Sequence, residues 1–450
     1  MTNEAVRAGE RPDGSVRSSG GAWQVVILAV VLVLGLGMAY YYEGILIPLR
    51  QSAARAAGVS TGYWSDLYPR WLGARELLWH RRNPYNAEFT REIQRGFYGR
   101  AIDPARKNDV RDPQAFAYPV YVVFLLLPFL HFSFDSVRIV FTAILLLLTV
   151  GSVPLWLRVF RVRLRGWAVV LAVIATLSSY PVVDGLHLQQ MTLLVGALLA
   201  ASLAALVSGR LVLAGMLLAL GSIKPQLVIF LVAFLLLWTV WAWRSRKSFA
   251  VGFGATMAAL LIASEMVLPG WFRYWWQEIH AYAGYVKPSL LRTLMGQSAA
   301  VVVAAITVLL CVAVFWRVRK EAAGSDGFNL GIVSALLVTV ILLPNAGGSK
   351  YNQVLLIPAV IWLLLRGWRL AKSSRLARVL WLLAVNVLVW QWIVAAIVCF
   401  AVVIMHQTVQ REATPFVAGP ELLVFLFPLA LAPFVLDAAL LFIRRHRIEI

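Results

Sequence analysis

Long apolar runs alternate with short polar segments along almost the whole chain. Each run is close to the roughly 20 apolar residues that a helix needs to cross a bilayer. The pattern predicts an all-α polytopic membrane protein. About thirteen candidate runs lie at 23–42, 117–132, 136–157, 167–183, 189–207, 211–223, 225–243, 249–269, 298–316, 328–344, 351–366, 379–405 and 421–443.

The run at 117–132 is the weakest candidate. It is short, begins with Tyr118 and Pro119, contains Pro128 and includes His131. Proline disfavours a regular helix interior. We therefore interpret this segment as re-entrant or lying on the membrane surface, which leaves about twelve crossing helices.

The charge pattern orients the predicted helices. The chain has 41 Lys and Arg against 21 Asp and Glu, with 61% hydrophobic residues. In a soluble protein such an excess would suggest nucleic acid as a partner. Here most positive charges lie in short loops between apolar runs, as in cytoplasmic loops, and they indicate contact with membrane lipids and no nucleic-acid partner. The clusters are Arg7, Arg11 and Arg17; Arg158 to Arg165; Arg244 to Lys247; Arg317 to Lys320; Arg366 to Arg378; and Arg444 to Arg447.

Placing these clusters inside gives one domain organisation. A disordered cytoplasmic N-terminus (1–22) precedes a single transmembrane domain (23–443), and a basic cytoplasmic C-terminus (444–450) follows it. The long polar segment 43–115 becomes the first extracytoplasmic loop, and we expect it to carry surface helices. The other outer segments are 184–189, 270–297, 344–351 and 406–420.

Asp66 is the most informative residue of the first loop. It is a lone acid among aromatic residues, in the stretch Gly62-Tyr63-Trp64-Ser65-Asp66-Leu67-Tyr68. A carboxylate at such a place can act as a general base. It can also cap a surface helix that begins at Leu67 and has Pro69 in its first turn.

Two lysines stand where charge is expensive. Lys224 precedes Pro225 between two apolar runs, and Lys350 lies between two others. Such cations either bind a functional partner, for which a phosphate is well suited, or extend towards the lipid headgroups.

Several kinds of site have no support in the sequence. The two cysteines, Cys311 and Cys399, lie in apolar runs, and no H-E-x-x-H or paired-Cys pattern exists. We therefore predict no protein-built metal centre and no cofactor. A glycine-rich phosphate loop and an Asp-x-Asp pattern are also absent, which argues against a nucleotide-sugar donor.

The order and spacing of short motifs resemble glycosyltransferase family 87, the polyprenyl-phosphate-sugar-dependent mannosyltransferases of the membrane GT-C class. The resemblance is carried by Asp66, Asn83-Pro84-Tyr85, Phe116-Ala117-Tyr118-Pro119, Gln190, Ile223-Lys224-Pro225 and Ser349-Lys350-Tyr351. The chain departs from the family where Lys350 stands in place of a frequent histidine.

The resemblance implies a GT-C-like bundle in the plasma (inner) membrane of the cell envelope. The enzyme would move mannose from a polyprenyl-phosphate donor to a lipid or glycan hydroxyl at the extracytoplasmic face, with inversion and without a metal. Asp66 would be the general base. The candidate donor-phosphate partners are Lys224, Arg292 and Lys350, and the candidate sugar or acceptor contacts are Tyr118, His187, Gln190, Asn345 and Tyr351.

Three alternatives remain open at this point. The donor sugar could be a pentose such as arabinose. The chain could be a flippase or transporter of lipid-linked sugars, although transporters often show internal repeats and none is found here. It could also be a glycan polymerase or ligase, which usually carries its large outer loop later in the chain.

Overall fold

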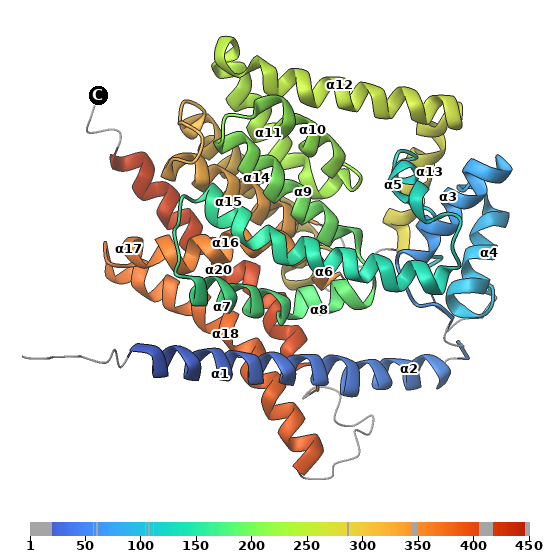
Figure 1. Cartoon of the computed structure of the whole chain (residues 1–450), viewed down its shortest axis with the longest axis horizontal. Coiled ribbons are helices and arrows are strands. Elements are labelled where there is room, and N and C mark those ends of the chain that lie inside the picture. The colour runs from blue at the N-terminus through green and yellow to red at the C-terminus, as the bar shows by residue number, and fades with distance from the viewer. Residues whose placement is uncertain are drawn as a thin grey trace, which may run out of the picture.

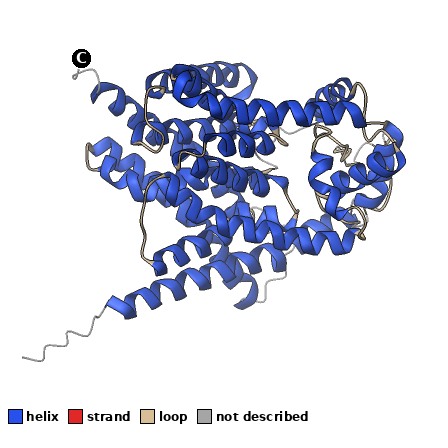
Figure 2. Ribbon diagram, turned by 45° about the horizontal axis from the view of Figure 1, so that its top comes forward, coloured by secondary structure: helices blue, strands red, loops and turns tan. Residues whose placement is uncertain are grey.

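The computed structural model describes residues 20–56, 58–59, 62–103, 105–106, 109–110, 112–285, 288–343, 349–404 and 417–445. Throughout these ranges the regular elements are helices and no strand occurs (Figure 2). The predicted all-α polytopic membrane fold is confirmed. Most of the predicted N-terminal segment 1–22, the last five residues of 444–450, most of the loop 406–420, and Asn345 lie outside the described residues.

Seven helical segments are long and apolar enough to cross a membrane, or eight if one bent pair counts as a single span. The bent pair is α7 (Gly166–Leu177) and α8 (Tyr180–His187), which meet at 59°. The others are α1 (Gly20–Tyr40) with η1 (Tyr41–Leu46) and α2 (Ile47–Ala56); α6 (Phe134–Val159); α12 (Trp243–Val267); α14 (Leu290–Val318); η3 (Lys350–Leu356) with α16 (Ile357–Trp362), η4 (Leu363–Gly367) and α17 (Trp368–Ala371); α18 (Arg375–Ile404); and α20 (Gly419–Arg445).

Four shorter apolar helices complete the set, so every predicted span other than 117–132 has a helical counterpart. One of them is buried along nearly its whole length and lies inside the bundle (Figure 1). This helix is α15 (Asp326–Leu342). The other three are α9 (Met191–Val207), α10 (Leu211–Gly221) and α11 (Pro225–Trp241).

The segment 117–132 does not cross the membrane as one helix. It forms the five-residue α5 (Val122–Leu126) and the short 3₁₀ helix η2 (Leu127–Phe129). Neither is near the length that a span requires. The interpretation of this segment as non-crossing agrees with the structure.

The first helix is longer than predicted. The polar loop was expected to begin at residue 43, but the helix continues through the π-helical η1 to Ala56. Tyr41, Tyr42, Ile45 and Leu46 are buried in a cluster with residues of α8, α18 and α20. The burial of these side chains stabilises the helix where its sequence becomes less hydrophobic.

A cap of shorter helices lies at one end of the bundle, on the right of Figure 1. Aromatic pairs join its parts: the ring centroids of Tyr85 and Tyr274 are 6.5 Å apart, and those of Tyr121 and Trp271 are 6.1 Å apart. The cap therefore combines the first loop with a segment from the middle of the chain. Its helices are α3 (Tyr68–His80), α4 (Ala87–Tyr98), α5 and α13 (Trp271–Tyr285).

Gly62 allows the segment before α3 to lie directly on the backbone of α4 at Gly96. The backbone N–H of Tyr63 donates to the carbonyl oxygen of Gly96 at 3.0 Å. A Cβ atom on Gly62 would lie 2.2 Å from that oxygen, and the carbonyl oxygen of Phe97 would be 2.5 Å away. Only glycine fits at position 62 without moving backbone, and this contact fixes the start of the segment that carries Asp66.

Gly62→Ala should therefore destabilise the cap by about 1–3 kcal/mol, the usual cost of overpacking. We expect a lower thermal unfolding temperature in detergent and reduced activity. Gly151→Ala on α6 is the control, because a Cβ atom there meets nothing within 4 Å. Equal unfolding temperatures for the two variants would contradict the proposed contact.

Candidate active site

Asp66 contacts the turn between α8 and α9 through both its backbone and its side chain. The backbone N–H of Asp66 donates to the carbonyl oxygen of Leu188 at 3.0 Å. Its Oδ2 atom accepts a hydrogen bond from Nε2 of Gln190. The N-cap of α3 is Leu67, and no side chain caps that helix. The capping interpretation of Asp66 is therefore wrong.

Gln190 connects Asp66 to Lys224. The ammonium nitrogen of Lys224 donates to Oε1 of Gln190 at 2.8 Å and to Oγ1 of Thr192 at 2.9 Å. Thr192 in turn donates to Oδ1 of Asn352 at 3.0 Å. Lys224 and Gln190 are 7% and 1% exposed. A buried ammonium group thus lies one amide away from a carboxylate, and every link is a hydrogen bond, as burial of charge requires.

Arg70 is a second cation beside Asp66. It lies in the first turn of α3, and its Nη1 donates to the carbonyl oxygen of Asp66 at 2.7 Å. Its guanidinium carbon is 4.4 Å from the ring centroid of Tyr118, and Nζ of Lys224 is 5.6 Å from the same centroid. Both cations therefore lie within cation–π distance of the Tyr118 ring. The buried Nε of Arg70 has no hydrogen-bond partner within the described part of the chain.

A cavity of about 200 Å³ opens beside these residues. Its lining is mainly polar and comes from the first loop, the α8–α9 turn, the end of α13 and the segment before η3. The lining residues are Asp66, Arg70, Asp112, Gln114, Ala115, Ala117, Leu188, Tyr282, Tyr285, Ser349 and Tyr351.

Burial raises the pKa of the Asp66 carboxyl above its ordinary value, and the positive charges of Arg70 and Lys224 oppose that rise. Burial also raises the pKa of Tyr118 to about 12. A carboxylate with a raised pKa is a stronger base than an exposed aspartate, whereas the nearby cations favour its ionised form.

Strained backbone occurs on both sides of the contact between Asp66 and Gln190. Trp64 and Gln189 have φ angles of +42° and +49°, in the left-handed region that bulky residues rarely adopt. Such conformations cost about 1–3 kcal/mol each and persist where the surroundings determine them, often at functional sites.

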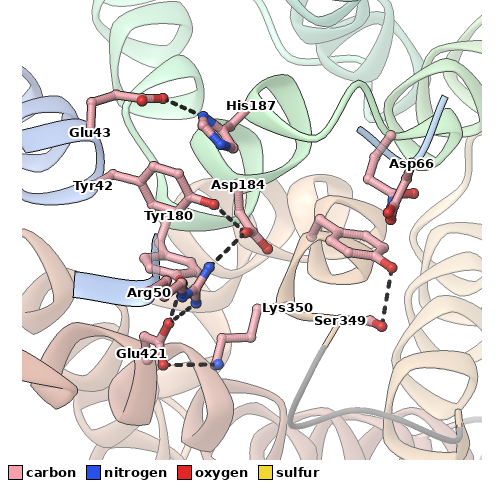
Figure 3. A network of polar contacts seen from close by, with 12 residues as sticks. Tyr42, Glu43, Arg50, Asp66, Tyr180, Asp184, His187, Ser349, Lys350 and Glu421 are labelled. Atoms are coloured by element: carbon pink, nitrogen blue, oxygen red, sulfur yellow. Dashed lines mark hydrogen bonds and ion pairs between the residues drawn. The ribbon is translucent and has the colours of Figure 1, made fainter. Parts of the chain in front are cut away.

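Lys350 points away from the cavity, although its neighbours Ser349 and Tyr351 line it. Its Nζ donates to Oε2 of Glu421 at 3.2 Å (Figure 3). Tyr351 remains in the site: its hydroxyl donates to Oγ of Ser349 at 3.1 Å, and Nζ of Lys224 is 5.3 Å from its ring centroid.

Arg292 and His187 also lie apart from the Asp66 cluster. Arg292 is exposed in the first turn of α14, and within the described ranges its side chain has no polar partner. Nδ1 of His187 is 2.8 Å from Oε1 of Glu43 (Figure 3). Lys224 is thus the one residue of the three predicted phosphate partners that the structure brings to Asp66.

A network of ionised side chains surrounds Lys350 (Figure 3). Arg50 forms ion pairs with Glu421 and, at 3.9 Å, with Asp184. The hydroxyl of Tyr42 donates to Asp184 at 2.5 Å, and that of Tyr180 donates to Glu421 at 2.6 Å. The network joins α2, α8, η3 and α20. Because α8 leads into Gln190 and η3 follows Ser349, it sets the spacing of two segments that form the site.

Sequence reasoning missed four ionisable residues that line the cavity: Arg70, Asp112, Tyr282 and Tyr285. Arg70 could have been found, because it lies in the first turn of α3, close in sequence to Asp66, and can reach back to it. The other three had no local signal, since the fold alone brings them to the cavity. In the described part of the chain no group of three or more His, Cys, Asp or Glu side chains gathers in one place.

Comparison with known proteins identifies the family of the chain. No curated protein and no solved structure matched the chain. The model of glycosyltransferase family 87 matches residues 116–344, just over half of the 450 residues. The matched region contains Tyr118, Gln190 and Lys224. The chain therefore belongs to glycosyltransferase family 87 and is a membrane glycosyltransferase.

Proposed function

We propose that the enzyme transfers mannose from a polyprenyl-phosphate donor to a hydroxyl group of a lipid or glycan acceptor, with Asp66 as the general base. One observation carries the proposal. The carboxylate of Asp66 lines a polar cavity and is held by a hydrogen bond from Gln190, which itself binds the buried ammonium group of Lys224.

The chemistry follows from this arrangement. The acceptor hydroxyl gives its proton to the Asp66 carboxylate while its oxygen attacks the anomeric carbon of the donor. The bond between that carbon and the phosphate oxygen breaks, and attack from the opposite face inverts the configuration. The departing phosphate gains negative charge, which nearby cations stabilise.

Arg70 and Lys224 are the cations that we assign to the donor phosphate. Both act on the charge of Asp66, and both lie against the ring of Tyr118. Arg70 lines the cavity, and its buried Nε has no hydrogen-bond partner in the part of the chain that the structure describes. Lys350 is already paired with Glu421, and Arg292 is exposed away from this cluster.

We keep the role of sugar or acceptor contact for those predicted residues that lie near the cavity. Tyr118, Gln190 and Tyr351 would position the sugar and the acceptor around Asp66. His187 is bound to Glu43 and packs edge-on against the ring of Tyr42, so its part is to support the helix that leads to Gln190. The positive loops favour a single transmembrane domain in the plasma membrane, with both termini in the cytoplasm and the cavity on the extracytoplasmic side.

Asp66→Asn should abolish transfer and leave a folded protein. The amide cannot take a proton, so we expect at least about a hundredfold fall in kcat, the lower range for a lost general base. The test measures mannose transfer from polyprenyl-phosphate mannose by the purified protein in detergent. Asp103→Asn in the same loop is the control, because Asp103 does not line the cavity. Near-normal turnover of Asp66→Asn would exclude Asp66 as the base.

Lys224→Met should lower kcat by about 10²–10³, the range seen when one stabilising donor of a developing negative charge is removed. Arg292→Met, which removes an exposed cation of the same charge, should leave kcat within about twofold. A larger loss in the Arg292 variant than in the Lys224 variant would reverse the assignment of the phosphate site.

The pH profile of kcat/KM provides a third test. The pKa of Asp66 is raised, so its base form is lost as the pH falls through a value above the ordinary 3.8. The acid limb of the profile should therefore lie above about pH 4. Arg70→Gln removes a charge that lowers this pKa, so the limb should move to higher pH. An unmoved limb would show that Arg70 does not act on the base.

A further inference from the structure

Three side chains that line the cavity have no role in the proposed mannose transfer: Asp112, Tyr282 and Tyr285. The two tyrosines lie in the last turn of α13, with ring centroids 5.2 Å apart in an edge-to-face arrangement. After burial, the carboxylate of Asp112 is the largest influence that raises the pKa of both phenols, to about 12 for Tyr282. The three groups line one cavity, and the phenols stay protonated as donors.

The carboxylate of Asp112 is oriented by its own loop. Oδ1 accepts a hydrogen bond from the backbone N–H of Gln114 at 2.9 Å, and Oδ2 accepts one from Nε2 of Gln114 at 3.1 Å. Two ionised oxygens offer about four acceptor positions, so about two remain for a ligand. No ion pair neutralises this carboxylate among the residues described. The phenolic hydroxyls of Tyr282 and Tyr285 likewise have no hydrogen-bond partner in the described ranges.

These groups suit an uncharged ligand with many hydroxyl groups. The carboxylate accepts hydrogen bonds from hydroxyl groups, the phenols donate to hydroxyl oxygens, and the rings offer apolar faces. An unpaired carboxylate repels a phosphate. A plain alkyl chain would leave the two phenols and the remaining acceptor positions of Asp112 without ligand partners.

The same residues share the cavity with Asp66, whereas Lys224 reaches Asp66 only through Gln190. Lys224 is not among the residues that line the cavity; its ammonium group binds Oε1 of Gln190, and Nε2 of Gln190 binds Asp66. Arg70, the other proposed phosphate partner, lines the cavity next to Asp66. A ring bound at Asp112 can therefore present a hydroxyl to Asp66 from the cavity, on the side away from Lys224.

We propose that Asp112, Tyr282 and Tyr285 bind a sugar ring of the acceptor, so that the enzyme extends a glycoside rather than a simple lipid alcohol. This inference rests on the proposed function, in which Asp66 takes the acceptor proton. It makes the three residues determinants of acceptor specificity.

The test uses the full chain in detergent, polyprenyl-phosphate mannose as donor and octyl α-D-mannopyranoside as the acceptor probe. Asp112→Asn, Tyr282→Phe and Tyr285→Phe should each raise the KM for the acceptor about five- to tenfold or more, the loss expected for one hydrogen bond to a ligand. The KM for the donor should stay within about twofold. Tyr274→Phe on the same helix and Asp103→Asn in the same loop are matched controls, because neither residue lines the cavity.

An unchanged acceptor KM in all three variants, with wild-type transfer intact, would overturn the inference and leave the proposed function standing. A rise in the donor KM instead would overturn it too, because the subsite would then hold the donor sugar. If the wild-type chain transfers no mannose to any acceptor from this donor, the proposed function itself fails. The phenylalanine variants keep the ring packing, so the test does not depend on Asp112→Asn folding normally.

Discussion

The chain of hydrogen bonds from Asp66 through Gln190 to Lys224 is the interaction on which the site depends. A buried ammonium group is costly unless its donors are bound, and a buried carboxylate is costly for the same reason. The amide of Gln190 serves both, since its Nε2 donates to the carboxylate of Asp66 and its Oε1 accepts from the ammonium group of Lys224. This arrangement requires Asp66 in the first loop, Gln190 at the start of α9 and Lys224 before α11 to meet at one point. The strained turns at Trp64 and Gln189 are consistent with that requirement.

The second polar network gives this arrangement a rigid frame. It pairs two cations, Arg50 and Lys350, with the two acids Asp184 and Glu421, so its formal charge is balanced. Because such a network is costly to break one partner at a time, it holds α8 and η3 in a fixed relation. Catalytic geometry of this kind tolerates little displacement of its parts.

Much of the fold could be predicted, because hydropathy reports directly on membrane burial. Eight of the twelve predicted spans, with the bent pair counted as one, have helices long enough to cross a membrane, and the other four have shorter apolar helices. The non-crossing segment before α6 and the all-helical class also follow from hydropathy. The extension of the first helix to Ala56 and the bend between α7 and α8 did not, because both depend on tertiary packing. For the site, Asp66, Gln190 and Lys224 carried local signals: a lone acid, an amide at a span boundary and a lysine before proline. Lys350 carried the same signal as Lys224, yet its partner is Glu421, some seventy residues later in the chain. Sequence alone does not distinguish a lysine that binds a ligand from one that binds a distant acid.

The most direct test of the central claim is a cryo-electron microscopy structure of the enzyme with polyprenyl-phosphate mannose bound. The account predicts that phosphate oxygens lie within about 4 Å of nitrogen atoms of Arg70 and Lys224, the ordinary distance of an ion pair. It also predicts that the Asp66 carboxylate faces the anomeric carbon from the side opposite the phosphate. A phosphate bound at Lys350 or Arg292, or a sugar turned away from Asp66, would contradict it.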